Sequence, residues 1–267
     1  MLNHNEFRRR LQAIKCFSLD LDGTFYLGDT LFDFSIPFLH HLEQTGRSYL
    51  FTTNNSSLSP REYVQKFARM GLEVPVERIY TSADATAEYL LNHGPGHRLF
   101  VLGTEPLIRF FERKGFIMEP DSPDALVLGF DLDFDYSRLR HAARLLHRGV
   151  PFYATHPDLT CPAENDEWMP DCGSLSMALT AASGVQPMFL GKPYRPMVEG
   201  MLRRAGVGRE ELAVVGDRLQ TDIRTGRDNG LLSILVLTGE TRPEDLEKSD
   251  VQPDFVVTSL GELMEFL

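Results

Sequence analysis

Short apolar segments and helix-like segments alternate along the chain, and this alternation is the first indication of the fold. A short apolar run that ends in Gly, Asp, Thr or Lys is typical of a buried strand followed by a loop. The predicted strands are 15–21, 48–52, 79–82, 99–102, 125–128, 152–155, 188–190, 212–215, 233–237 and 255–257. The predicted helices are 5–13, 36–44, 83–92, 105–114, 136–147 and 262–267, with three more that close at Gly71, Ala205 and Asn229. Such alternation predicts an α/β fold with a doubly wound parallel sheet covered by helices on both faces.

The middle of the chain carries strand–helix units of its own, punctuated by Gly94-Pro95-Gly96 at the start and Ser183-Gly184 at the end. We therefore predict an inserted α/β domain over residues 84–185. Residues 1–83 and 186–267 would form the core domain. A chain of 267 residues is long enough for two modest domains.

The first predicted strand ends in Asp20-Leu21-Asp22-Gly23-Thr24. Side chains alternate along a strand, so Asp20 and Asp22 would point to the same side, about 6–7 Å apart. Two buried anions need a cation or basic side chains beside them. The arrangement suits a carboxylate nucleophile, a second carboxyl for proton transfer and a hard metal ion. The alternative is an acidic turn, in which Asp and Gly are common.

Polar side chains also follow three other predicted strands. These residues are Thr53, Asn54, Lys192, Asp217 and Asp222. In parallel α/β sheets, ligands bind beyond the carboxyl ends of the strands. We therefore expect all of these side chains to face one crevice, together with the two aspartates above.

Each of these groups has a functional and a structural interpretation. Thr53 and Asn54 can donate hydrogen bonds to an oxyanion, or they form a polar loop that caps the next helix. Lys192 offers a point charge for a phosphoryl group, or it is a solvated lysine. Asp217 favours a magnesium ion, which prefers oxygen ligands. Asp222 is either near that ion or stabilises a helix N-terminus.

Composition excludes several classes of partner. Hydrophobic residues make up 42% of the chain and charged residues 24%, as in ordinary globular proteins. The net charge of −11 argues against nucleic acid or an anionic membrane as the main partner. A phosphate site would have to supply its own local positive charge.

The three cysteines are too few and too scattered for a secreted disulfide framework. Cys161 and Cys172 lack CxxC or Cys/His clustering, so we expect no zinc site. Residues 1–15 are polar and contain no apolar segment of a secretory signal. The longest apolar run, near residues 231–237, is far shorter than the roughly 20 residues that span a membrane. The expected location is the cytoplasm.

Four motifs in order resemble those of the haloacid dehalogenase superfamily. They are Asp20-Leu21-Asp22-Gly23-Thr24, Thr53-Asn54-Asn55-Ser56, Gly191-Lys192-Pro193, and Gly216-Asp217 with Asp222. The order, the spacing and the positions at strand ends cover essentially the whole chain. The Asn-Asn-Ser sequence, the insertion and the segment 170–174 (Pro-Asp-Cys-Gly-Ser) resemble the NagD-like, para-nitrophenyl phosphatase-like branch, whose inserted domain is a C2 cap.

The resemblance implies a role for each matching residue. Asp20 would attack phosphorus and become an aspartyl phosphate. Asp22 would protonate the leaving alcohol and then activate water. Thr53 and Asn54 would bind the phosphoryl group, and Lys192 would stabilise its charge.

The same resemblance implies a magnesium cofactor. Asp20, the backbone carbonyl of Asp22, and Asp217 would bind the ion, with Asp222 in the shell around these ligands. Phosphoryl transfer depends mainly on positioning and charge neutralisation, which agrees with this set of residues.

A closing cap would exclude water and bulky polymers and so favour small substrates. The cap positions that we expect to set specificity are His156, Asp158, Cys161, Glu164, Trp168 and Asp171. Pyridoxal-phosphate phosphatases of this branch carry a cap-loop histidine, and Cys161 is the closest position here, which argues against that substrate. Residues 31–34 and 194–196 also depart from the family pattern without removing a catalytic group.

The sequence therefore predicts a Mg²⁺-dependent phosphatase of small phosphorylated metabolites, sugar phosphates among them, with para-nitrophenyl phosphate as an artificial substrate. Two alternatives remain at this stage, namely a phosphotransferase to an alcohol acceptor and a non-catalytic sensor of phosphometabolites. Partners would be the small metabolite and, through exposed apolar cap surface, a second copy in a homodimer. We expect neither nucleic acid nor a membrane as a partner.

Overall fold

The computed structural model describes residues 1–162 and 168–267. These residues form two compact units, which we describe separately. The first unit consists of Met1–Thr53, Val64–Tyr80 and Val198–Leu267, and the second of Asn54–Tyr63 and Thr81–Met197. Two of the boundaries between the units fall inside helices, namely α3 (Pro60–Arg69) and α8 (Arg195–Ala205).

The first unit is built on a six-stranded sheet with the order β15-β14-β13-β1-β4-β5. The strands are β1 (Cys16–Leu19), β4 (Ser48–Thr53), β5 (Ile79–Thr81), β13 (Leu212–Gly216), β14 (Leu232–Val236) and β15 (Phe255–Val257). All pairings from β15 to β4 are parallel. Every residue of β1, β13 and β14 is buried, as expected for strands covered on both faces.

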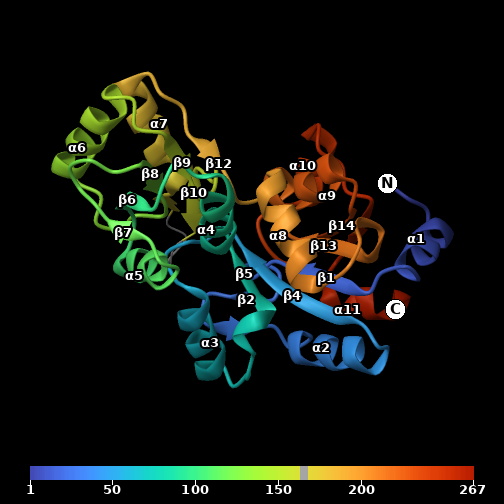
Figure 1. Cartoon of the computed structure of the whole chain (residues 1–267). Coiled ribbons are helices and arrows are strands. Elements are labelled where there is room, and N and C mark those ends of the chain that lie inside the picture. Colours follow the sequence, from blue (N-terminus) through green and yellow to red (C-terminus); the bar gives the residue numbers. More distant parts are fainter. Residues whose placement is uncertain (163–167) are drawn as a thin grey trace. The chain divides into compact units, whose positions relative to one another are not determined.

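Helices cover both faces of this sheet. Figure 1 shows α2 (Ser35–Gln44) and α11 (Leu260–Leu263) on one face, with α8 and α9 (Arg224–Asn229) on the other. The remaining elements of the unit are α1 (His4–Leu11), the hairpin β2 (Tyr26–Leu27) and β3 (Thr30–Leu31), α10 (Pro243–Lys248), and the short helical turns at Val76–Arg78, Arg209–Glu211, Leu219–Ile223 and Met264–Phe266. Phe51 of β4 packs with Phe25 and Phe67 in a buried aromatic group.

The second unit contains a five-stranded parallel sheet with the order β12-β9-β8-β6-β7. Its strands are β6 (Arg98–Leu102), β7 (Ile117–Met118), β8 (Ala125–Leu128), β9 (Phe152–Ala154) and β12 (Met188–Phe189). Its helices are α4 (Ser82–His93), α5 (Glu105–Arg113), α6 (Tyr136–His147) and α7 (Cys172–Ser183). An antiparallel hairpin of β10 (Thr160–Pro162) and β11 (Trp168–Pro170) precedes α7.

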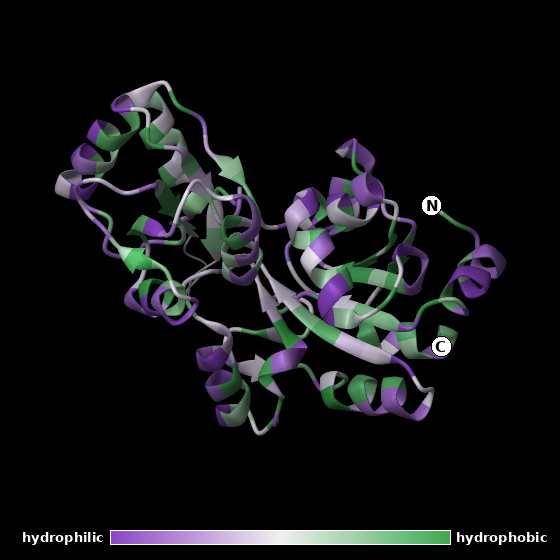
Figure 2. Ribbon diagram, viewed as in Figure 1, coloured by the Kyte–Doolittle hydropathy of each residue, from purple (hydrophilic) through white to green (hydrophobic). Residues whose placement is uncertain are grey.

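Alternation along the strands divides the core of this unit into two layers. Ala125 and Val127 of β8 pack with α4 and α5, whereas Leu126 and Leu128 pack with α6 and α7. Figure 2 shows the strands as largely hydrophobic, whereas the helices combine hydrophobic and hydrophilic residues. Successive side chains of each strand point to opposite faces of the sheet, so each face contributes an apolar layer that helices cover.

The predicted α/β class with parallel sheets is confirmed, and nearly all predicted strands and helices are present. The hairpins β2–β3 and β10–β11 and the strand β7 were not predicted, because two or three residues carry no detectable periodicity. The first strand ends at Leu19, two residues earlier than predicted. The backbone turns after it, with the N–H groups of Thr24 and Phe25 donating to the carbonyl of Leu21. Strand alternation therefore does not extend to Asp22. No helix among the described residues is long and apolar enough to span a bilayer.

Candidate active site

Three carboxylates gather in the first unit, where two neighbouring strands end. Oxygens of Asp20, Asp217 and Asp222 lie within 4.8 Å of one another. Asp20 follows β1 and Asp217 follows β13, and the Asp20 N–H donates to the carbonyl of Val215 at 2.9 Å. Asp20 is partly buried, and Asp217 and Asp222 are buried. Sequence reasoning correctly predicted that these strand ends converge.

Backbone and hydroxyl donors hold the two buried carboxylates in place. Asp217 accepts hydrogen bonds from the N–H of Glu240 at 2.7 Å and from the hydroxyl of Thr24 at 3.3 Å. Asp222 accepts from the N–H of Arg218 at 3.2 Å. Burial, followed by the negative charge of Asp222, raises the pKa of Asp217 from 3.8 to about 7. This cluster therefore favours a positive charge.

Glycines line the cluster closely. Gly23 has a φ of +81°, and a Cβ at this position would lie 2.6 Å from Oδ2 of Asp217. A Cβ at Gly239 would collide with the same carboxylate. Hard oxygen ligands on a glycine-rich, close-packed frame fit a small divalent cation. The residues present therefore fit the metal that the motifs imply.

Asp22 lies outside this group of carboxylates. Its side chain is exposed at the surface, yet crowding by protein removes enough water to raise its pKa. The positive charges of Lys66 and Arg218 oppose that rise. Lys66 itself lies 3.4 Å from a carboxylate oxygen of Asp29 and 4.3 Å from the centre of the Tyr26 ring.

Asn54 and Lys192 come together in the second unit. Oδ1 of Asn54 accepts from the N–H of Lys192 at 2.7 Å, and Nδ2 donates to the Lys192 carbonyl at 3.0 Å. The Lys192 side chain is buried, with 2% of the residue exposed, so the alternative of a solvated lysine is wrong. Thr53, the last residue of β4, is also buried but belongs to the first unit.

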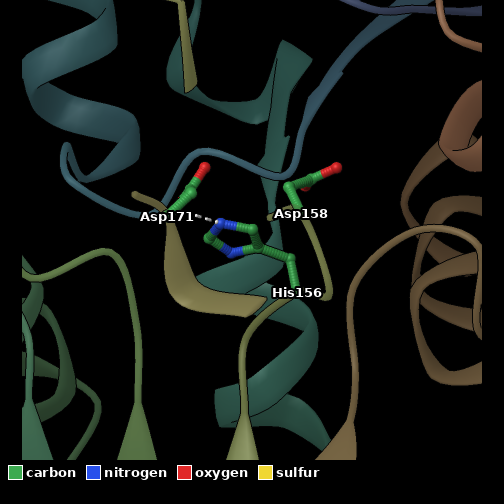
Figure 3. A group of neighbouring side chains, drawn as sticks. All are labelled: His156, Asp158 and Asp171. Carbon is green, nitrogen blue, oxygen red and sulfur yellow. Dashed lines mark hydrogen bonds and ion pairs between the residues drawn. The ribbon is translucent and has the colours of Figure 1, made fainter. Parts of the chain in front are cut away.

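The expected cap residues lie in the second unit. His156, Asp158 and Asp171 are neighbours, with one atom of each within 4.8 Å of the others (Figure 3). Nε2 of His156 lies 2.9 Å from Oδ1 of Asp171, and Nδ1 lies 2.8 Å from the hydroxyl of Thr155. Both ring nitrogens are therefore engaged, and the group is a hydrogen-bonded network rather than a set of free metal ligands.

The other cap candidates have different environments. Cys161 of β10 is half-buried, and Trp168 of β11 is 56% exposed. Glu164 lies outside the described residues. Cys172 is fully buried, and burial raises the pKa of its thiol to about 12, which makes it unreactive.

Sequence reasoning missed the loop after β14. The Thr238 hydroxyl donates to the carbonyl of Gly23 at 2.6 Å, and the next residues supply Gly239 and the Glu240 N–H that contact Asp217. The signal was present, because this loop also follows the carboxyl end of a strand of the same sheet.

Comparison with known proteins identifies the family. A family model for haloacid dehalogenase-like hydrolases matches residues 17–117, and a second, HAD-hydrolase-like model matches residues 189–263. An acid sugar phosphatase of Staphylococcus saprophyticus is 32% identical over 258 residues, covering 96% of this chain and 99% of that protein.

Solved structures agree with this assignment. The 4-nitrophenylphosphatase of Thermotoga maritima matches with a TM-score of 0.92 and 44% identity, covering 96% of this chain and 98% of that one. NagD of E. coli matches with a TM-score of 0.85 and 30% identity, over 93% of this chain and 98% of that one. The chain therefore belongs to the haloacid dehalogenase-like hydrolases and is an enzyme of their NagD-like branch.

Proposed function

We propose that this hydrolase is a Mg²⁺-dependent phosphatase of small phosphorylated metabolites, sugar phosphates among them. The observation that carries the proposal is the group of three carboxylates at the ends of β1 and β13. The names of the relatives, an acid sugar phosphatase and a 4-nitrophenylphosphatase, point to the same reaction class.

The metal would be held by Asp20, Asp217 and the backbone carbonyl of Asp22, with Asp222 in the shell around them. Bound there, Mg²⁺ would supply positive charge against the carboxylates and the phosphoryl oxygens. The repulsion between Asp217 and Asp222 supports this assignment, because a cation would relieve it.

The residues of the chain account for the covalent steps. Asp20 attacks phosphorus, the bond from phosphorus to the ester oxygen breaks, and Asp22 gives its proton to the departing alkoxide. Asp22, now ionised, takes a proton from water as the water oxygen attacks the aspartyl phosphate and frees inorganic phosphate. A raised Asp22 pKa supports its role as the proton donor. Thr53, the backbone N–H of Asn54 and Lys192 bind and neutralise the phosphoryl group.

We also propose that the inserted domain of residues 84–185 is a C2 cap, with residues 1–83 and 186–267 as the catalytic core. Parallel α/β structure in the second unit supports a C2-type cap. Cys161 and Trp168 of the hairpin β10–β11 are proposed to contact the organic part of the substrate.

The test is hydrolysis of para-nitrophenyl phosphate by the wild type and by Asp20→Asn, with and without Mg²⁺. We expect the variant to lose at least about a thousandfold in kcat, because the amide is a poor nucleophile. Asp228→Asn, which alters an exposed carboxylate on α9, is the matched control and should be unaffected. Equal activity of Asp20→Asn and wild type would refute the mechanism. Transfer of phosphate to added glycerol, in place of release to water, would identify a phosphotransferase.

A further inference from the structure

The Asn54 amide is fully committed to protein partners. Beyond its two bonds to the Lys192 backbone, Nδ2 donates to Oδ2 of Asp158 at 2.8 Å. A flipped amide would place N–H against N–H of Lys192 and a carbonyl against the Asp158 carboxylate, so only one orientation is satisfied. Asp158 therefore fixes the side chain that brackets the backbone of Lys192.

A second set of hydrogen bonds holds Ser56, two residues after Asn54. The Ser56 oxygen accepts from the N–H of Phe130 at 2.9 Å and lies 3.1 Å from the Thr155 hydroxyl. Thr155 in turn lies 2.8 Å from Nδ1 of His156, and Nε2 of His156 lies 2.9 Å from Asp171. All of these side chains are buried.

One contact in this second set has a fixed donor. A carboxylate only accepts, so Nε2 of His156 carries a proton and donates to Oδ1 of Asp171. Asp171 also accepts from the Cys172 N–H at 2.6 Å. The hydroxyls of Ser56 and Thr155 each donate or accept, so this set links Ser56 to the Asp171 carboxylate through hydroxyl and imidazole groups whose donor order has two solutions.

The residues that bond to segment 54–57 follow successive strands of one sheet. Thr155 to Asp158 follow β9, Phe130 follows β8 and Lys192 follows β12. Thr104, after β6, donates to the carbonyl of Ser57 at 2.8 Å. The segment 54–57 is thus bonded along the carboxyl edge of the second sheet.

We propose that Asp158 and the His156–Asp171 pair are positioning residues for phosphate binding. They orient Asn54, Ser56 and the Lys192 backbone, and they do not recognise the organic part of the substrate. The inference rests on the proposed function, because Asn54 and Lys192 are assigned there to the phosphoryl group and Ser56 belongs to the same segment as Asn54. It gives these three cap residues a role that is independent of which alcohol the substrate carries.

The first test compares Asp158→Asn with wild type, using para-nitrophenyl phosphate, glucose 6-phosphate and inorganic phosphate as a competitive inhibitor. Loss of a charge-assisted hydrogen bond at Asn54 should raise the KM of both substrates and the Ki of phosphate by the same factor, about tenfold. Inorganic phosphate has no organic part, so an unchanged Ki would overturn the proposal. Asp121→Asn, an exposed carboxylate in the same unit, is the control. A wild type that neither hydrolyses nor binds phosphate would instead refute the proposed function.

The second test does not depend on activity. We expect the ¹⁵N NMR signals of the His156 ring at pH 7.5 to show a protonated Nε2, because the Asp171 carboxylate only accepts. Comparison with His156→Gln assigns the signals. An unprotonated Nε2 would remove the bond to Asp171 and overturn the Ser56 arm of the proposal.

Discussion

Replacement of Asp217 by Asn tests whether the carboxylate cluster is built around a cation. A pKa of about 7 for Asp217, against an ordinary 3.8, means that ionising this group in the metal-free protein costs about 4 kcal/mol at pH 8. The Asn side chain removes that cost. Asn has one side-chain oxygen where Asp has two, so either the Glu240 N–H or the Thr24 hydroxyl loses its acceptor. The lost hydrogen bond costs about 1–1.5 kcal/mol.

The expected result is that Asp217→Asn stabilises the metal-free protein at pH 8 by about 2–3 kcal/mol. The direction of the pH dependence of stability follows from the difference between the folded and unfolded pKa values of Asp217. Because the folded pKa lies above the unfolded one, the unfolded state releases its proton first, and stability falls as pH rises from about 4 to about 7. At pH 5 the same pKa difference costs only about 1–2 kcal/mol, so the variant and the wild type should be nearly equal.

The assay is urea unfolding in EDTA at pH 5 and pH 8, repeated at pH 8 with Mg²⁺. Magnesium should stabilise the wild type, since it binds the folded protein alone, and should stabilise Asp217→Asn much less. Asp228→Asn controls for a change in net charge away from the cluster. A variant less stable than wild type at pH 8 in EDTA, or one equally stabilised by Mg²⁺, would refute the reasoning.

Two further substitutions address the groups around Lys192. Lys192→Met keeps the buried aliphatic stem of the side chain but removes the ammonium. The kcat/KM for para-nitrophenyl phosphate should therefore fall about 10²–10³-fold with the fold intact. Lys248→Met, at an exposed position of α10, is the control and should leave kcat/KM unchanged. Gly191→Ala would place a Cβ 2.6 Å from Oδ1 of Asn54. The free energy of unfolding, measured in urea, should therefore fall by about 1–3 kcal/mol. Gly208→Ala is the control and should lose far less, because its Cβ would lie 3.5 Å from Glu211.

The sequence predicted the α/β class and the convergence of Asp20 with Asp217 for a simple physical reason. A parallel sheet forces the carboxyl ends of neighbouring strands to the same edge, and β1 pairs directly with β13. Only the strand pattern and the residue after each strand were needed. The position of Asp22 was less predictable, because it depends on where β1 stops, and the turn that begins at Leu21 has no periodicity.

The network around His156 could not have been predicted in the same way. Its residues come from a segment before α3, from the ends of β8 and β9, and from the N-cap of α7, and they are joined by single hydroxyl and imidazole contacts. Hydrophobic periodicity describes which face is buried but not which hydroxyl meets which ring nitrogen. The sequence therefore identified His156, Asp158 and Asp171 as relevant positions and assigned them to substrate specificity by analogy. Their hydrogen-bond partners, which only the structure supplies, favour a role in holding the segment that we propose to bind phosphate, and the phosphate Ki of Asp158→Asn separates the two interpretations.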